Sequence, residues 1–172
     1  WETIKTNVDP HDNFDSLQVK LIDSSQILLE NFFLNRPFLN NLKPTKQKID
    51  GITYAQKILK KEKVIDWNEE AININNRIRA FDSFPGTYCY LMKKRVQFSG
   101  SFLLENSTRN NFPGKISGVK LISGDKSVLK ISCGIGFVGI AKLKKDGGKW
   151  VTAKEFFNSI YPQNHEIQFT SG

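Results

Sequence analysis

Few residues in this sequence could perform covalent or metal chemistry. The two cysteines, Cys89 and Cys133, and the two histidines, His11 and His165, lack the C-x-x-C or H-x-x-x-H spacing of a zinc site. Cys133 lies in an apolar run, which is typical of a buried free thiol rather than a nucleophile. We therefore expect no metal site, and we do not regard Cys133 as a catalytic candidate. Two free thiols also favour a reducing compartment.

The run 133–136, Cys-Gly-Ile-Gly, has the small residues of a phosphate-binding loop. It lacks the third glycine and the following helix that such a loop needs. We interpret it instead as a bend between strands that only small residues can make.

Basic residues carry more information. Lys and Arg number 25 against 17 Asp and Glu, so the net charge is +8, which favours a polyanionic partner. Seven lysines fall between Lys43 and Lys63, where the only acids are Asp50 and Glu62. If this segment and the later basic residues share one face, they form a strip that binds phosphates. The alternative interpretation is a solubilising surface.

Three aromatic residues near this strip, Tyr54, Trp67 and Phe84, could stack on bases. Each lies beside a proline, a glycine or an apolar residue at the boundary of an element, which favours a place in the core.

The first third of the chain predicts a strand and a helix. Residues 2–8 alternate as in a strand, and Asp12 is placed to cap a helix whose apolar residues recur near the 3.6 period and which Ser24 and Ser25 could interrupt. Residues 35–51 hold prolines, asparagines and lysines without periodicity, which predicts a linker. No segment is apolar for long enough to span a bilayer, so we expect no membrane association. The chain begins with Trp1, which suggests a fragment or processed product.

The remainder predicts a small β domain. Asn68 is placed to cap a helix with apolar residues at 71, 74, 78 and 81, which Pro85 and Gly86 end. Short β-type runs follow at 87–92, 95–104, 116–122, 127–133 and 137–143. Thr152 and Glu155 form a capping box for a short helix, and the polar tail from Pro162 onward is expected to fray. This order predicts an α+β fold with a small barrel or sandwich.

Several ungapped motifs in one order resemble a known family. They are Thr53-Tyr54-Ala55, Lys57-Ile58, Ile65-Asp66-Trp67 and Ile78-Arg79-Ala80-Phe81, followed by Phe84-Pro85-Gly86. They look like the segment between the domains of methionyl-tRNA formyltransferases, with Ser83 and Phe84 where that family has Pro and Trp. Residues 133–157 are similar to the family's closing strands and terminal helix, with Lys144 where a Gln is usual. Residues 12–21 resemble the last helix of its catalytic domain.

The resemblance implies a two-part protein. Members join a Rossmann-like domain, which binds 10-formyltetrahydrofolate and carries the catalytic Asn, His and Asp, to an OB-like open barrel that helps to hold tRNA. This chain resembles the second part together with the last strand and helix of the first. The resemblance thus implies no catalytic residue and no bound cofactor in this chain. We therefore expect 1–35 to end the catalytic domain, 36–56 to be a linker and 57–172 to form the barrel domain. The chemistry would lie in a part that is absent from this chain.

Family analogy and charge clustering together give a set of RNA-binding candidates. Lys57 matches a basic position of the family motif, and the other candidates depend on clustering alone. The candidate residues are Lys57, Lys60, Lys61 and Lys63, followed as weaker candidates by Arg77, Arg79, Lys93, Lys94 and Arg95. Arg79 has an alternative structural role, in which it would pair with Asp66 or Glu70.

Two other functions are consistent with the sequence. One is a catalytically inactive relative that serves as a structural RNA-binding subunit of a ribonucleoprotein assembly, for example a mitochondrial ribosome. The other is a relative of the formyltetrahydrofolate dehydrogenase hydrolase domain, which the run Phe98 to Asn106 resembles. A hydrolase of a small folate has no need for a charge of +8, so the charge favours tRNA or another structured RNA. The compartment would be the bacterial cytoplasm or the mitochondrion.

Overall fold

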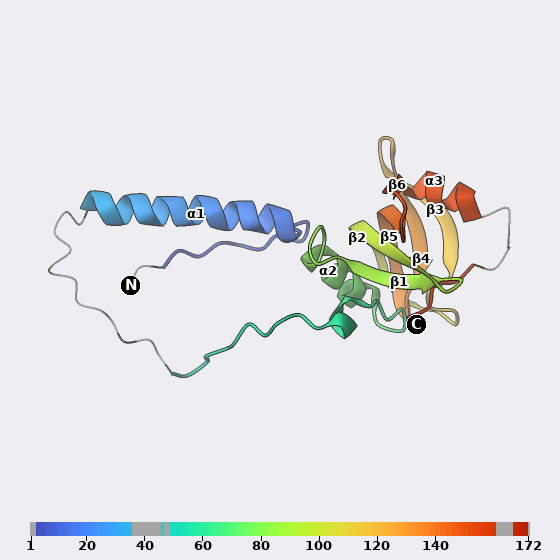
Figure 1. Cartoon of the computed structure of the whole chain (residues 1–172), viewed down its shortest axis with the longest axis horizontal. Coiled ribbons are helices and arrows are strands. Elements are labelled where there is room, and N and C mark those ends of the chain that lie inside the picture. Colours follow the sequence, from blue (N-terminus) through green and yellow to red (C-terminus); the bar gives the residue numbers. More distant parts are fainter. Residues whose placement is uncertain (1–2, 36–45, 47–48, 161–166, 172) are drawn as a thin grey trace. The chain divides into compact units, whose positions relative to one another are not determined.

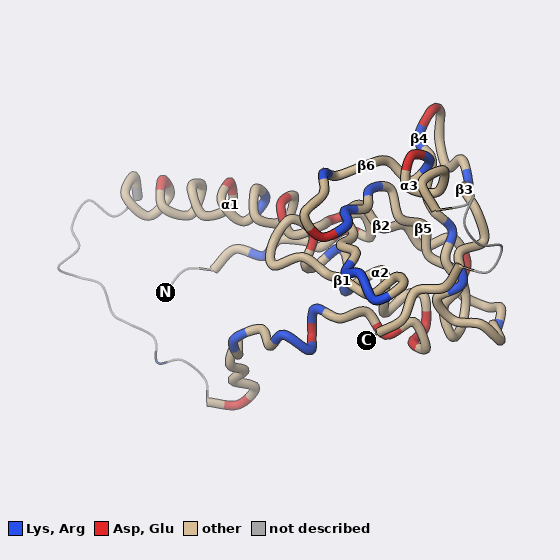
Figure 2. The backbone as a smooth tube through the Cα atoms, turned by 45° about the vertical axis from the view of Figure 1, so that its right-hand side comes forward, with Lys and Arg blue, Asp and Glu red and all other residues tan. Residues whose placement is uncertain are grey.

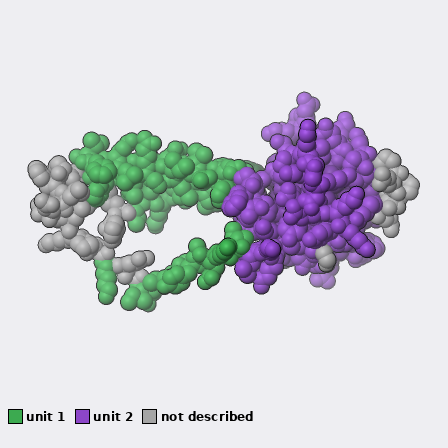
Figure 3. All heavy atoms as spheres, viewed as in Figure 1, with its two compact units in different colours: residues 1–58 green, residues 59–172 purple. Residues whose placement is uncertain are grey.

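The computed structural model describes residues 3–35, 46, 49–160 and 167–171. They fall into two compact units, residues 1–58 and residues 59–172 (Figure 3). The predicted linker, 36–56, lies largely outside the described residues, and 49–56 form no helix or strand. The assignment of 1–35 to a catalytic domain stays a prediction.

The first unit is built on α1 (Phe14–Asn35), one continuous helix (Figure 1). Asn13 begins it, not Asp12 as predicted, because the Asn13 and Ser16 side chains each accept the other's backbone N–H, at 2.9 and 3.0 Å. Ser24 and Ser25 do not interrupt the helix. The Ser25 hydroxyl donates to the Leu21 carbonyl one turn earlier, at 2.7 Å, and so needs no break.

The predicted strand at residues 2–8 is wrong, since residues 3–9 have no regular structure. An alternating pattern forms a strand only beside a partner that accepts its backbone hydrogen bonds, and the described part of this unit contains no strand. On α1, the apolar side chains Leu21, Leu29 and Phe33 are exposed and line a groove of about 730 Å³.

The second unit is an open antiparallel sheet with two helices against it (Figure 1). Its elements are η2 (Lys60–Lys63), α2 (Ala71–Ala80), β1 (Thr87–Leu91), β2 (Lys94–Arg109), β3 (Ile116–Ser123), β4 (Lys126–Ser132), β5 (Ile135–Lys145), β6 (Val151–Thr152) and α3 (Ala153–Ile160). The strand order is β1-β2-β5-β4-β3, with β6 on β5. The α+β class and the five longer strands are as predicted; the sheet is open rather than closed into a barrel.

Helix α2 begins later than predicted. Its apolar residues Ala71, Ile74 and Ile78 are fully buried, as the periodicity indicates. Asn68 does not cap it, because Glu70 occupies the N-cap position. The Ile72 backbone N–H instead donates to Oδ1 of Asn106, which comes from β2. The sheet therefore supplies the cap through a residue 34 positions away in sequence.

The core of this unit contains an aromatic cluster, and Phe169 near the end of the described chain completes it. Trp67 and Phe169 are stacked with ring centroids 5.7 Å apart, and Phe98 meets both rings edge-on. Residues Gln168 and Thr170 form bridges to Lys115 and Tyr90, so this segment joins β1 to the residue before β3. The prediction of a frayed tail is therefore wrong for 167–171, while 161–166 lie outside the described residues.

The glycine run bends closely against the chain, as predicted. The Gly134 N–H donates to the Trp67 carbonyl at 2.8 Å, and a Cβ at this position would lie 2.0 Å from the Asn68 carbonyl oxygen. Gly136 has φ +80°, and a Cβ there would lie 2.1 Å from the Glu105 carbonyl oxygen. Only glycine satisfies both approaches.

Candidate nucleic-acid interface

Three of the first group of predicted basic residues, Lys60, Lys61 and Lys63, belong to η2, and Lys57 precedes it in sequence as part of the first unit. Lys57, Lys60 and Lys61 are exposed, and Lys63 is half-buried. Directly after them, the Ile65 N–H donates to the Tyr88 carbonyl at 2.9 Å. Lys60, Lys61 and Lys63 therefore precede a segment that is fixed at the outer edge of β1.

The α2 arginines do not extend this group as a simple positive surface. Lys61 and Arg77 share a hollow of about 620 Å³ that Glu62, Asp66 and Glu69 also line. Arg77 Nη1 lies 3.0 Å from Glu69 Oε1. The carboxylates offset much of the positive charge here.

Arg79 lies two positions along the helix from Arg77, which places the two side chains on different sides of α2. Its Nη2 donates to Asn76 Oδ1 at 3.0 Å. The two arginines that the sequence grouped are thus separated by the helix geometry.

More basic residues accompany the hairpin between β1 and β2 than the sequence predicted. Its turn, Met92 and Lys93, has φ values of 49° and 63°, which suit a tight hairpin. Arg95 Nη2 and Nε lie 2.7 and 3.0 Å from Asp146 Oδ1, and the Asp146 N–H donates to the Arg95 carbonyl. These bonds hold the hairpin beside the turn that joins β5 to β6.

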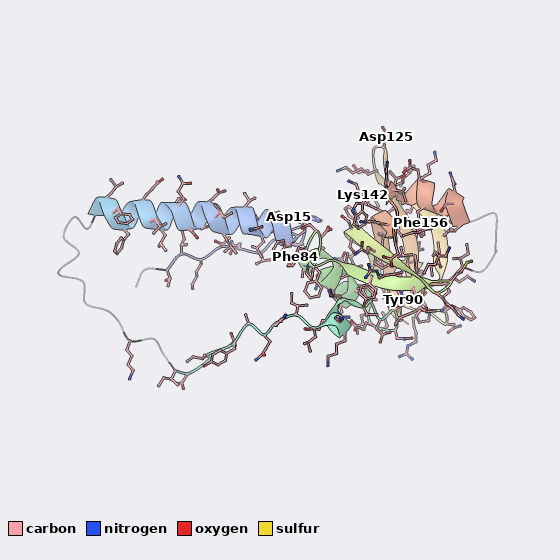
Figure 4. All side chains as sticks on the ribbon, in the orientation of Figure 1. Asp15, Phe84, Tyr90, Asp125, Lys142 and Phe156 are labelled. Carbon is pink, nitrogen blue, oxygen red and sulfur yellow. The ribbon has the colours of Figure 1, made fainter. Side chains whose placement is uncertain are left out.

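We call the resulting surface the basic corner. It consists of Lys93, Lys94, Arg95, Lys142, Lys144 and Lys149. All are exposed except Lys144, which is half-buried. Asp146, in the turn after β5, forms an ion pair with Arg95 of this corner. Lys and Arg recur along this unit in Figure 2, and Lys142 is labelled in Figure 4.

A row of side chains crosses the sheet next to this corner, and we call it the outer row: Tyr88, Gln97, Lys144 and Trp150. Tyr88 pairs with Gln97, and Gln97 pairs with Lys144. Lys144 Nζ lies 5.9 Å from the centre of the Trp150 ring. Their strand neighbours Cys89, Val96, Phe98 and Leu143 are buried in the core, so the outer row occupies the opposite face.

Sequence reasoning missed Lys142, Lys144, Lys149 and Trp150 as functional candidates. A signal was present, since Gly147 and Gly148 mark a hairpin that returns the chain onto β5. What could not be read from the sequence is that β2 pairs with β5 and thereby brings the first hairpin to this turn.

The three aromatic candidates differ in burial, and only one of them lies in the core as predicted. Trp67 is buried, as predicted, with 2% of its surface exposed. Tyr54 and Phe84, also expected in the core, are 82% and 70% exposed. Phe84, labelled in Figure 4, lies in the turn between α2 and β1 directly after Ser83, whose φ is 62°.

The cysteines are free and buried, as predicted. Burial raises the pKa of the Cys133 thiol to about 12 and that of Cys89 well above its usual value. Neither thiol has the character of a nucleophile. Within the described ranges, no group of three or more potential ligands could hold a metal ion, and no helix is long and apolar enough to cross a membrane.

Known proteins with similar sequences are methionyl-tRNA formyltransferases. The protein from Ralstonia nicotianae is 30% identical over 120 residues, which are 70% of this chain and 35% of that protein. The protein from Xylella fastidiosa is 28% identical over 158 residues, which are 91% of this chain and 49% of its own length. The chain thus spans between about a third and a half of the length of these relatives.

Solved structures of HypX from Aquifex aeolicus share the fold. One variant superposes with a TM-score of 0.59 at 19% identity and covers 90% of this chain and 27% of HypX. Another, described as a complex with tetrahydrofolic acid, has a TM-score of 0.55 at 18% identity and covers 81% of this chain and 23% of HypX. Neither alternative function gains support from these similarities.

The motifs that resemble formyltransferases from Lys57-Ile58 onward lie within the segment that the family model matches, whereas Thr53-Tyr54-Ala55 and residues 12–21 precede it. That model describes the C-terminal domain of formyl transferases and covers residues 57–161. It includes η2, the sheet and α3, and therefore every element that carries the basic corner and the outer row. The chain belongs to the formyl transferase C-terminal domain family.

Proposed function

We propose that this chain is the tRNA-binding C-terminal portion of a methionyl-tRNA formyltransferase. Transfer of the formyl group from 10-formyltetrahydrofolate would be carried out by a part that is not present here. The observation that carries the proposal is the basic corner, in which two turns that are about fifty residues apart in sequence meet through Arg95 and Asp146. Exposed lysines on adjacent turns bind a phosphate backbone and release its counterions.

Each predicted RNA-binding residue has a place in this proposal. Lys57, Lys60, Lys61 and Lys63 contact phosphates of the acceptor arm along the start of the domain. Lys93, Lys94 and Arg95 act with the lysines of β5 and the β5–β6 turn. Arg77 and Arg79 contribute less, because Arg77 already pairs with Glu69 and the two side chains diverge.

Matched charge reversals test the interface. Lys94→Glu combined with Lys149→Glu changes the corner, whereas Lys120→Glu combined with Lys126→Glu changes two exposed lysines of β3 and β4 by the same net charge. Binding of the full chain to tRNA is measured by fluorescence anisotropy across a range of salt concentrations. The corner variant should bind more weakly and lose about one unit of salt slope per phosphate contact removed. Equal weakening in both variants would show that only net charge matters.

The same assay extends to the first group, with Lys57→Glu, Lys60→Glu and Lys61→Glu combined. Unchanged affinity would remove these residues from the interface. The compartment, bacterial cytoplasm or mitochondrion, and membership of a ribonucleoprotein assembly stay predictions.

A further inference from the structure

Trp150 is placed as a surface aromatic rather than as part of the core. Its exposed fraction is 45%, against 2% for Trp67. It lies directly before β6, whose Thr152 pairs with Lys142 and whose Val151 pairs with Leu143. Leu143 faces the core, so the residue after it on β5, Lys144, faces outward. Trp150 lies on the same outward face, because its ring centre is 5.9 Å from Lys144 Nζ.

The outer row has this ring at one end of a line of side chains that crosses the sheet. Neighbouring strands are about 4.8 Å apart, so Tyr88 and Trp150 stand roughly 14 Å from each other across the sheet. Gln97 and Lys144 lie between them. Both rings have a cation over them, since the Arg95 guanidinium carbon lies 5.4 Å from the Tyr88 ring centre and Lys144 Nζ lies 5.9 Å from the Trp150 ring centre. Trp150 is exposed whereas Tyr88 is half-buried, so Trp150 is the more accessible of the two rings.

The charges around Trp150 suit an anionic ligand. Lys142, Lys144 and Lys149 lie within eight residues of it in sequence and on the same strand or turn. The nearby carboxylates are engaged: Asp146 with Arg95, and Glu155 with the Thr152 N–H and hydroxyl at 2.8 Å. An aromatic ring bordered by lysines binds a base by stacking and the adjoining phosphates by charge.

We propose that an unpaired nucleotide of the bound RNA stacks on Trp150, while Lys142, Lys144 and Lys149 hold the phosphates beside it. The proposal rests on the proposed function, because it assigns a subsite within the RNA interface. Inside an RNA duplex each base is stacked between its neighbours and its edges lie in narrow or shallow grooves, so away from the duplex ends only a single-stranded segment can present a base face to the ring. Stacking of this kind tolerates any base.

The experiment compares two RNAs and three variants of the full chain. The RNAs are a blunt duplex and the same duplex with a single-stranded 3′ extension. The variants are Trp150→Ala, Trp150→Phe and a control, Phe112→Ala. Phe112 is 61% exposed and has Lys115 Nζ 5.4 Å from its ring centre, so it matches Trp150 in exposure and in its cation partner.

Trp150→Ala should lower the affinity for the extended RNA by about tenfold and leave the affinity for the blunt duplex unchanged. Trp150→Phe should retain most of the affinity, because it keeps an aromatic face, and Phe112→Ala should have no effect. Thermal unfolding checks that every variant is folded. In the wild-type chain, the extended RNA should also quench tryptophan emission, and this quenching should be lost in Trp150→Phe.

Other outcomes overturn the proposal in distinguishable ways. If Trp150→Ala binds both RNAs as the wild type does, the subsite is wrong and RNA binding by the domain still stands. If Trp150→Ala weakens binding to both RNAs equally, the ring has a general role in the interface and does not select unpaired bases. If the wild-type chain binds neither of these RNAs nor tRNA, the proposed function fails and the subsite with it.

Discussion

Arg95 and Asp146 are bonded to each other through both side chain and backbone. The side chains meet at 2.7 Å, and the Asp146 N–H donates to the Arg95 carbonyl at 3.1 Å. One residue belongs to β2 and the other follows β5, so the pair ties two turns together. Since both side chains are substantially exposed, the ion pair contributes only about 0–1 kcal/mol of stability. Its main effect is on the charge of the basic corner.

Removal of this carboxylate should therefore strengthen RNA binding. Asp146→Asn takes one negative charge from beside Arg95 of the corner and keeps the backbone bond, so affinity for tRNA rises and its salt dependence steepens. The control is Asp125→Asn in the β3–β4 turn, another exposed turn carboxylate. An equal gain in both variants in a binding titration would contradict the location of the interface.

Phe169 should be a major contributor to the stability of the second unit. Its ring is 1% exposed and packs on Trp67, Phe98 and Phe156. Phe169→Ala should lower the free energy of unfolding by about 3–5 kcal/mol, as measured by urea denaturation. Thr170→Ala serves as the control, since its side chain is exposed and its backbone pairing with Tyr90 is preserved. A loss below about 1 kcal/mol for Phe169→Ala would mean that the segment does not close the core.

Gly134 should tolerate no side chain. Gly134→Ala would place Cβ 2.0 Å from the Asn68 carbonyl oxygen, and the clash is with backbone that cannot rotate away. We expect a loss of about 1–3 kcal/mol or more. Gly124→Ala tests conformational strain alone, because φ is +50° and nothing lies within 4 Å, so about 1 kcal/mol is expected. Thermal unfolding of the two variants should rank them in this order.

The two thiols should be unreactive until the protein unfolds. At pH 8, a thiol with a pKa of about 12 is almost wholly protonated, so Cys133 should not react with a disulfide reagent in the native protein. Because the pKa of Cys133 in the folded protein lies above its usual value of 9.0, the stabilisation of the neutral thiol is complete below pH 9 and is lost as the pH rises towards 12. Rapid labelling of either cysteine at pH 8 without denaturant would contradict this burial.

The sequence predicts the second unit well where a local pattern decides the structure. The apolar spacing of Ala71, Ile74 and Ile78 identifies the buried face of α2, and alternation with turn residues locates β1 to β5. The capping box of Thr152 and Glu155 is also present, since Glu155 N–H donates to Thr152 Oγ1 and Glu155 Oε2 accepts from the Thr152 N–H.

Predictions fail where a distant partner decides the structure. Asn106 rather than Asn68 accepts a backbone N–H at the start of α2. Residues 167–170 are ordered because Thr170 and Gln168 form β-bridges to Tyr90 of β1 and to Lys115. The candidate interface shows the same limit. Charge clustering identifies Lys93 to Arg95, but the pairing of β2 with β5 adds Lys144 and Trp150 to the same surface.

The closing segment has a consequence for biosynthesis. Trp67 and Phe169 stack although they are 102 positions apart in sequence. A ribosome must therefore synthesise nearly the whole domain before this cluster can assemble. Until then, Trp67 and Phe98 lack the ring of Phe169 as a packing partner. Contacts between residues so far apart in sequence form late in folding, which lengthens the time during which a chaperone can bind. A chain stopped after α3 would stay in that vulnerable state.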